Sequence, residues 1–101
     1  MDSSKIDALK IELAVSLRDI AGVRAVYLFG SALHSHTPRD ADLLVVYQAP
    51  LTPMTAPSMR NRIEQTVSTT LELPAHLMFF TEREAREFRA RTKFALVFSS
   101  D

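Results

Sequence analysis

Hydrophobic residues recur every three or four positions in two stretches of the chain, which is the spacing of an amphipathic helix. The first stretch predicts a helix from about Ser4 to Ala21, followed by Gly22 where a helix C-terminal glycine belongs. The second stretch predicts a helix that begins near Met59 and ends before Pro74. Each helix therefore has one apolar face to pack against the rest of the protein.

Three apolar runs rich in β-branched and aromatic residues predict buried strands over residues 23–29, 41–47 and 75–80. The capping-box pattern at 81–84 (TERE) predicts a last helix that extends to about Arg91. The tail Phe94–Phe98 is apolar and fits either a fourth strand or further packing by that helix. Three prolines within residues 48–57 predict a loop or arm.

The order of these elements is helix, strand, strand, helix, strand, helix. It predicts an α+β or α/β sandwich in which helices pack against a small mixed β-sheet. The 101 residues fit one domain, residues 1–101, and the sequence contains no internal repeat or low-complexity tract.

Composition narrows the functional classes. Twelve basic residues balance twelve acidic ones, so no bulk binding of nucleic acid is expected. Apolar runs are too short to span a membrane, and the polar first ten residues do not resemble a signal peptide, so the expected location is the cytoplasm. Without cysteine, any metal must be held by oxygen or imidazole.

Two aspartates and a Gly-Ser pair lie at the junction of the first two predicted strands. Asp40 and Asp42 are two residues apart, so their side chains point the same way and their mutual repulsion favours a bound cation such as Mg²⁺. Gly30 lets the backbone approach a ligand, and a helical turn starting at Ser31 offers donors for phosphate oxygens. Alternatively, the pair is only a turn and the aspartates are solvated strand ends.

These residues resemble the signature of the nucleotidyltransferases of the DNA polymerase β superfamily, especially the minimal nucleotidyltransferases of bacteria and archaea. That signature is an apolar strand, Gly-Ser, a spacer, and Asp-x-Asp leading into an apolar strand. Here it is matched by residues 28–31 (LFGS) and 40–45 (DADLLV). The likeness is specific over about residues 26–47 and looser to about residue 84.

The resemblance implies transfer of a nucleoside monophosphate from an NTP, with ATP the expected donor, to a hydroxyl. It implies that Gly30 and Ser31 contact the phosphates and that Asp40 and Asp42 bind two Mg²⁺ ions, which Mn²⁺ can replace. It also suggests a nucleotide contact for Arg60, although a surface arginine is the simpler interpretation. The chain has no room for an acceptor-binding domain, so a helical protein partner, as in toxin–antitoxin pairs, or a homo-oligomer is expected.

His76 occupies the third-strand position where the family usually has a third carboxylate. Three interpretations stay open: a histidine without chemistry, a general base that replaces the carboxylate, and a ligand for a softer metal. The alternative function is accordingly a catalytically impaired module that binds NTP and metal, or a partner.

Two further patterns carry weaker chemistry. His34 and His36, together with Asp40, have the residue types of a zinc site, but neighbouring loop histidines are more often solvated. The charged run at 81–93 has the spacing of a solvated helix face, and Tyr27 and Phe29 are most simply core residues.

Overall fold

The computed structural model describes residues 1–48 and 55–100 of the chain. In these ranges helices and strands follow one another as α1 (Ser3–Ser16), β1 (Val23–Phe29), α2 (Ser31–His34), β2 (Ala41–Tyr47), α3 (Thr55–Leu71), β3 (Ala75–Phe80), α4 (Glu82–Arg89) and β4 (Phe94–Ser99). The three predicted strands have the expected bounds, and the apolar tail is a fourth strand.

The strands form one mixed sheet with the order β3-β2-β1-β4. β1 pairs antiparallel with both β2 and β4, whereas β2 pairs parallel with β3. A parallel pair needs a crossover connection, and α3 supplies it between β2 and β3. The predicted α+β class, a small mixed sheet packed with helices, is confirmed.

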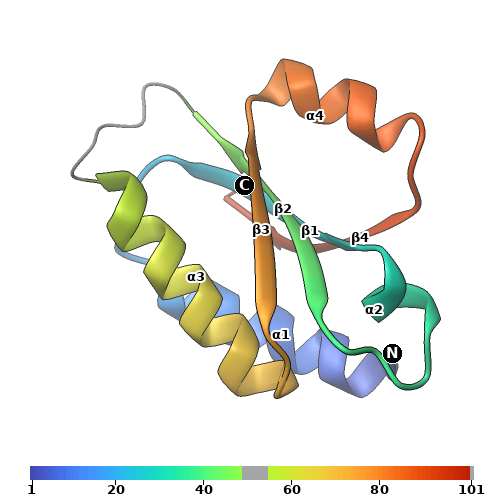
Figure 1. Ribbon diagram of the computed structural model, residues 1–101. Coiled ribbons are helices and arrows are strands. Elements are labelled where there is room, and N and C mark those ends of the chain that lie inside the picture. Colours follow the sequence, from blue (N-terminus) through green and yellow to red (C-terminus); the bar gives the residue numbers. More distant parts are fainter. Residues whose placement is uncertain (49–54, 101) are drawn as a thin grey trace.

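Helices cover the two faces of the sheet unequally (Figure 1). α1 and α3 lie together on one face, and the shorter α4 lies on the other. The larger core, between the sheet and the α1–α3 pair, includes Leu9, Leu13, Leu43, Val45, Ile63 and Val67. Alternate residues of the same strands, such as Leu44 and Val46, form a smaller core beneath α4 with Ala85.

The first helix ends at Ser16, five residues before the predicted end near Ala21. Beyond it the chain leaves in short turns, in which the Ile20 amide donates to the Leu17 carbonyl at 3.2 Å. Leu17 is still buried after the helix has ended, which is why the hydrophobic periodicity continued. The Arg62 guanidinium satisfies the helix end by donating to the Ser16 carbonyl oxygen at 2.9 Å.

The start of the last helix was predicted correctly, whereas the start of the middle helix was not. At α4, the Glu84 amide donates to the Thr81 hydroxyl and the Thr81 amide donates to the Glu84 carboxylate, so the predicted capping box is present. α3 begins at Thr55, four residues before the predicted start near Met59, because Pro57 is tolerated in the first turn of a helix. Residues 49–54 of the predicted proline-rich loop lie outside the described residues.

None of the described helices is both long and apolar enough to cross a membrane.

Candidate functional site

The turn after β1 brings Gly30 directly against Asp42. Gly30 has a backbone φ of +76°, a conformation that residues with a side chain rarely adopt. A Cβ atom at this position would lie 2.7 Å from Oδ2 of Asp42. The carboxylate therefore occupies the space that the missing side chain leaves open, so the predicted phosphate turn and the predicted metal ligand are in contact range.

Ser31 begins the short helix α2, as the sequence predicted. The turn is closed by two backbone hydrogen bonds, from the Leu33 amide to the Gly30 carbonyl at 3.1 Å and from the Ser35 amide to the Ser31 carbonyl at 2.8 Å. Ser31 itself is exposed. Its hydroxyl is therefore accessible to a ligand beside Gly30 and Asp42.

The sheet register places Asp42 beside His76. Asp42 is paired with Phe29 of β1 on one side and with His76 of β3 on the other. Nδ1 of His76 lies 3.9 Å from Oδ1 of Asp42, and Nε2 lies 4.0 Å from Oδ2 of Asp40. One imidazole ring therefore faces both carboxylates, as expected if Asp40 and Asp42 point the same way. We call Asp40, Asp42 and His76 the Asp–His cluster.

The Asp–His cluster is accessible from solvent. The side chains of Asp40 and Asp42 are 35% and 32% exposed, and that of His76 is 64% exposed. The nitrogen–oxygen distances within the cluster exceed hydrogen-bonding distance, so the ring is not locked onto either carboxylate. The ring can therefore turn toward a ligand without breaking a hydrogen bond to either carboxylate.

An aromatic group adjoins the cluster on the α4 side of the sheet. The rings of Phe29 and Phe88 meet edge-to-face at 4.9 Å between centroids, and Phe88 also meets Phe80 at 5.8 Å. Because Phe29 is the register partner of Asp42, this apolar group borders the carboxylates directly. These rings form an apolar surface on one side of the site.

The metal-binding capacity of the site depends on additional ligands. Nowhere in residues 1–48 and 55–100 do three or more histidine and acidic side chains gather closely enough to hold a metal ion alone. The zinc alternative, with His34, His36 and Asp40, is therefore not formed, and His76 does not complete a three-ligand site as it stands. Two partly exposed carboxylates fit Mg²⁺, because this ion is usually held by one or two carboxylates with phosphate oxygens and water.

Arg60 lies away from the Asp–His cluster. Its guanidinium is centred 4.9 Å from the ring of Phe79 and lies 3.8 Å from the Glu64 carboxylate. Phe79 is three residues beyond His76 on β3 and packs on the opposite face of the sheet, against the core beneath α1 and α3. The expected nucleotide contact of Arg60 is thus not supported, because the α3 start is placed at the other end of β2.

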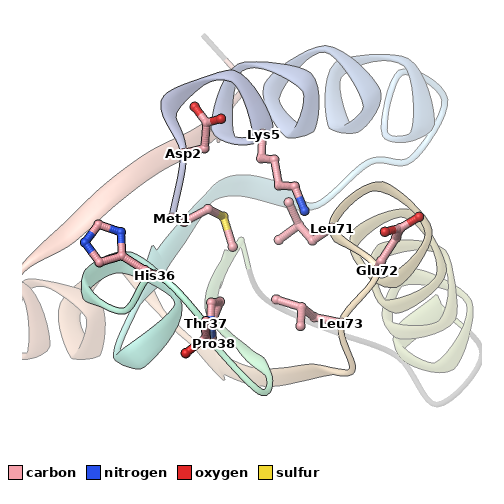
Figure 2. Close-up of a pocket in the computed structure, with 9 residues that line it drawn as sticks. All are labelled: Met1, Asp2, Lys5, His36, Thr37, Pro38, Leu71, Glu72 and Leu73. Carbon is pink, nitrogen blue, oxygen red and sulfur yellow. The ribbon is translucent and has the colours of Figure 1, made fainter.

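A cavity of about 300 Å³ lies at the same end of the molecule but on the α1–α3 side (Figure 2). The apolar side chains of Met1, Leu71 and Leu73 point toward its centre. Thr37 and Pro38, from the loop that leads to Asp40, form another wall. The cavity is therefore separate from the Asp–His cluster and adjoins only the back of its loop.

One polar contact near the site was not expected from the sequence. Tyr27 is buried as predicted, but its hydroxyl accepts a hydrogen bond from Arg89, whose guanidinium also lies 5.0 Å from the tyrosine ring centre. The sequence placed Arg89 on a solvated helix face, and no local pattern links residues 62 positions apart. This hydrogen bond links the C-terminal end of α4 to β1.

Comparison with known proteins gives no match among protein-family models and none among the curated proteins. Solved structures do match. A chain from a toxin–antitoxin complex with AMP-PNP shares 20% identity at a TM-score of 0.56, with 91% of this chain and 74% of that chain covered. A chain from the complex of the tri-AMPylated Shewanella oneidensis HEPN toxin with the MNT antitoxin shares 19% identity at 0.55, covering 94% and 73%.

A third match is a candidate nucleotidyltransferase from Sulfolobus solfataricus, with 20% identity, a TM-score of 0.52 and coverage of 97% of this chain and 86% of that chain. These identities are low, so the likeness concerns the fold. The mixed sheet and the Gly30–Asp42 contact agree with the resemblance found in the sequence. The chain therefore has the fold of the minimal nucleotidyltransferases.

Proposed function

We propose that this chain is a nucleotidyltransferase that transfers a nucleoside monophosphate from an NTP, with ATP the expected donor, to a hydroxyl group. The observation that carries the proposal is the position of the Asp42 carboxylate in the space left by Gly30, with Asp40 and Asp42 on either side of one imidazole ring. This arrangement puts an anion-accepting turn next to a pair of cation-binding carboxylates. The reaction would take place in the cytoplasm, where NTPs are available.

Asp40 and Asp42 would hold Mg²⁺, or Mn²⁺ in its place, together with the triphosphate. When bound, the metal neutralises charge on the phosphates and on the attacking and leaving oxygens. Ser31 is exposed beside Gly30, so its hydroxyl would donate a hydrogen bond to a phosphate oxygen. The missing side chain at Gly30 leaves room for the Asp42 carboxylate directly beside the phosphate-binding turn.

His76 would act as the general base. In its neutral form the imidazole accepts the proton of the acceptor hydroxyl, whose oxygen then attacks the α-phosphorus of the NTP. The bond between the α-phosphorus and the bridging oxygen breaks, and pyrophosphate leaves. The ring is well placed for this role because it is exposed and faces both carboxylates.

The acceptor hydroxyl would belong to a partner protein. The described helices and strands form one sheet and its covering helices. One solved structure with this fold contains an AMPylated toxin bound to an antitoxin, which supports a protein acceptor. A helical partner that places a hydroxyl beside the Asp–His cluster would complete the site.

The direct test is pyrophosphate release from ATP with Mg²⁺ or Mn²⁺, in the presence of co-purified partner protein. The wild-type chain is expected to release pyrophosphate, and Asp42→Ala is expected to lose this activity by about 10²-fold or more. Gln65→Ala, an exposed change on α3, serves as the matched control. No release with any NTP, metal or partner would contradict the catalytic proposal.

A second candidate function follows from His76 itself. If the missing third carboxylate has abolished turnover, the chain is a module that binds NTP and metal, or a partner. It would then be stabilised by ATP with Mg²⁺ without releasing pyrophosphate. His76→Asp would be expected to gain activity in that case, whereas His76→Ala would be expected to lose activity if His76 is the base.

A further inference from the structure

Lys93 lies beside the turn at Gly30, at the end of the sheet that carries Asp42. β4 pairs antiparallel with β1, and Phe94 is the register partner of Phe29 (Figure 1). Lys93 directly precedes Phe94, and Gly30 directly follows Phe29. Because the two strands run in opposite directions, the same register continued by one residue places Lys93 across from Gly30. A cation is therefore next to the turn that is proposed to bind phosphate.

The connection from α4 to β4 is attached at both ends to one residue of β1. Arg89, the last residue of α4, donates a hydrogen bond to the Tyr27 hydroxyl. At the other end, the ring of Phe94 meets the Tyr27 ring edge-to-face, with 5.0 Å between the ring centroids. These two contacts hold residues 90–93 close to β1, so the backbone of Lys93 has a defined position beside the site.

The charge of Lys93 has no structural partner in the described chain. α4 ends at Arg89, and the helix dipole acts only on charges within the last turn, so a cation at residue 93 does not stabilise that helix end. Lys93 is exposed, and among residues 1–48 and 55–100 no carboxylate lies within ion-pairing distance of its ammonium group. The ammonium group is therefore available to a ligand.

Positive charge is concentrated in this part of the chain. Residues 86–93 contain one acidic side chain and four basic ones, Arg86, Arg89, Arg91 and Lys93. A local excess of positive charge attracts anionic ligands even though the whole chain has a formal net charge of zero. Of these four cations, only Lys93 directly adjoins the paired ends of β1 and β4. It is therefore the cation that can contact an anion bound at Gly30.

We propose that Lys93 binds the terminal phosphates of the NTP. This inference rests on the proposed function, because it requires the triphosphate to lie between Asp42 and the turn at Gly30. Across this end of the sheet, β2 carries Asp42, Gly30 follows β1, and Lys93 precedes β4, in that spatial order. A triphosphate whose α-phosphate lies at the carboxylates and whose chain passes the turn extends toward Lys93.

A lysine in this position stabilises the leaving pyrophosphate. Transfer breaks the bond between the α-phosphorus and the bridging oxygen, and the bonding electrons leave with the β-phosphate. The ammonium group of Lys93 offsets the negative charge that develops there and keeps its own protons. Adjacent strands are about 4.8 Å apart, so the backbone of Lys93 lies about 10 Å from that of Asp42, and the long lysine side chain can reach back over the intervening turn.

Isothermal titration calorimetry with ATP and Mg²⁺ tests the role of Lys93. Lys93→Met keeps most of the side-chain length and removes the charge, so the dissociation constant for ATP is expected to rise about 10-fold or more. Lys93→Arg keeps the charge and is expected to stay within about threefold of the wild type. Arg83→Met, the matched control, removes an exposed cation at the start of α4 and is expected to bind like the wild type.

The outcomes separate this inference from the proposed function. Equal affinities of the wild type and Lys93→Met would overturn the role of Lys93 and leave the proposed function standing. A wild type that binds ATP through Lys93 without releasing pyrophosphate would refute the catalytic step alone. A wild type that does not bind ATP with Mg²⁺ would overturn both.

Chemical protection provides a second measurement that needs no substitution. The chain contains three lysines, and the other two, Lys5 and Lys10, lie in α1. ATP with Mg²⁺ is expected to slow the acetylation of Lys93 several-fold, measured by mass spectrometry, and to leave Lys5 and Lys10 unchanged. Inorganic triphosphate with Mg²⁺ is expected to protect Lys93 as well, because the contact is to phosphate. Equal protection of all three lysines, or protection of Lys93 by ATP but not by triphosphate, would overturn the inference.

Discussion

The face of the sheet beneath α1 and α3 is closed, whereas the face beneath α4 is open at the end that carries Asp42. On the closed face, Leu43 and Val45 are fully buried beneath residues such as Ile63. On the open face, the side chains of Asp42 and its neighbour His76 are 32% and 64% exposed. Successive side chains of β2 point to opposite faces of the sheet, so β2 contributes to stability on one face and to the candidate site on the other.

This difference predicts that stability and ligand binding can be changed separately. Variants on the closed face should lower the free energy of unfolding while leaving the response to ATP and Mg²⁺ intact. Variants at the Asp–His cluster should do the reverse, because exposed carboxylates contribute little to folding. The following changes test that separation, beginning with the largest expected effect on stability.

Ile63→Ala removes a fully buried side chain from the closed face. We expect a loss of about 2–5 kcal/mol in the free energy of unfolding, measured by urea denaturation, because the change leaves a cavity in the core. The variant should still be stabilised by ATP with Mg²⁺ at a temperature where it is folded. A folded variant that no longer responds to the ligand would show that the two faces are not independent.

Gly30→Ala tests the contact between the turn and the carboxylate. Alanine is strained at φ +76°, and its Cβ would overlap Oδ2 of Asp42. We therefore expect the free energy of unfolding to fall by about 1–3 kcal/mol and the stabilisation by ATP with Mg²⁺ to be lost. Gly22→Ala is the matched control: φ is +100°, but the nearest atom to its Cβ would be 3.6 Å away, at Met59. The control should lose stability and keep the response. Equal ligand responses in the two variants would contradict the proposed role of Gly30.

Thr81→Ala removes the capping box of α4. We expect the free energy of unfolding, again measured by urea denaturation, to fall by about 1 kcal/mol, which is typical of the loss of an N-cap residue. The effect should be smaller than that of Ile63→Ala because α4 covers only part of the open face. A loss as large as that of Ile63→Ala would mean that α4 is as important to the fold as the α1–α3 layer.

Local patterns in the sequence predicted the strands and the capping box well. β1 and β2 are apolar except for Arg24 and Asp42, and polar residues or glycine bound them, so nearby residues determine their limits. The end of α1 was predicted too late, because Leu17 and Ile20 pack into the core from turns that follow the helix. A hydrophobic periodicity shows which residues are buried, and the residues that follow a helix can be buried too. The periodicity alone therefore does not show where the helix ends.

Contacts between distant segments were predicted less well. The pairing of His76 with Asp42 follows from the parallel register of β2 and β3, and the sequence suggested it only through the resemblance to a family. The placement of Arg60 on Phe79 depends on where α3 starts relative to the sheet. No pattern in the sequence fixes that starting point.

The most direct test of the central claim compares the melting temperatures of the wild type and Asp42→Asn, each with and without ATP and Mg²⁺. Asp42→Asn keeps the size of the side chain and removes its charge, so the ligand-free proteins should melt at nearly the same temperature. The account predicts that ATP with Mg²⁺ raises the melting temperature of the wild type and leaves that of the variant unchanged. Equal shifts in both proteins, or no shift in the wild type, would contradict it.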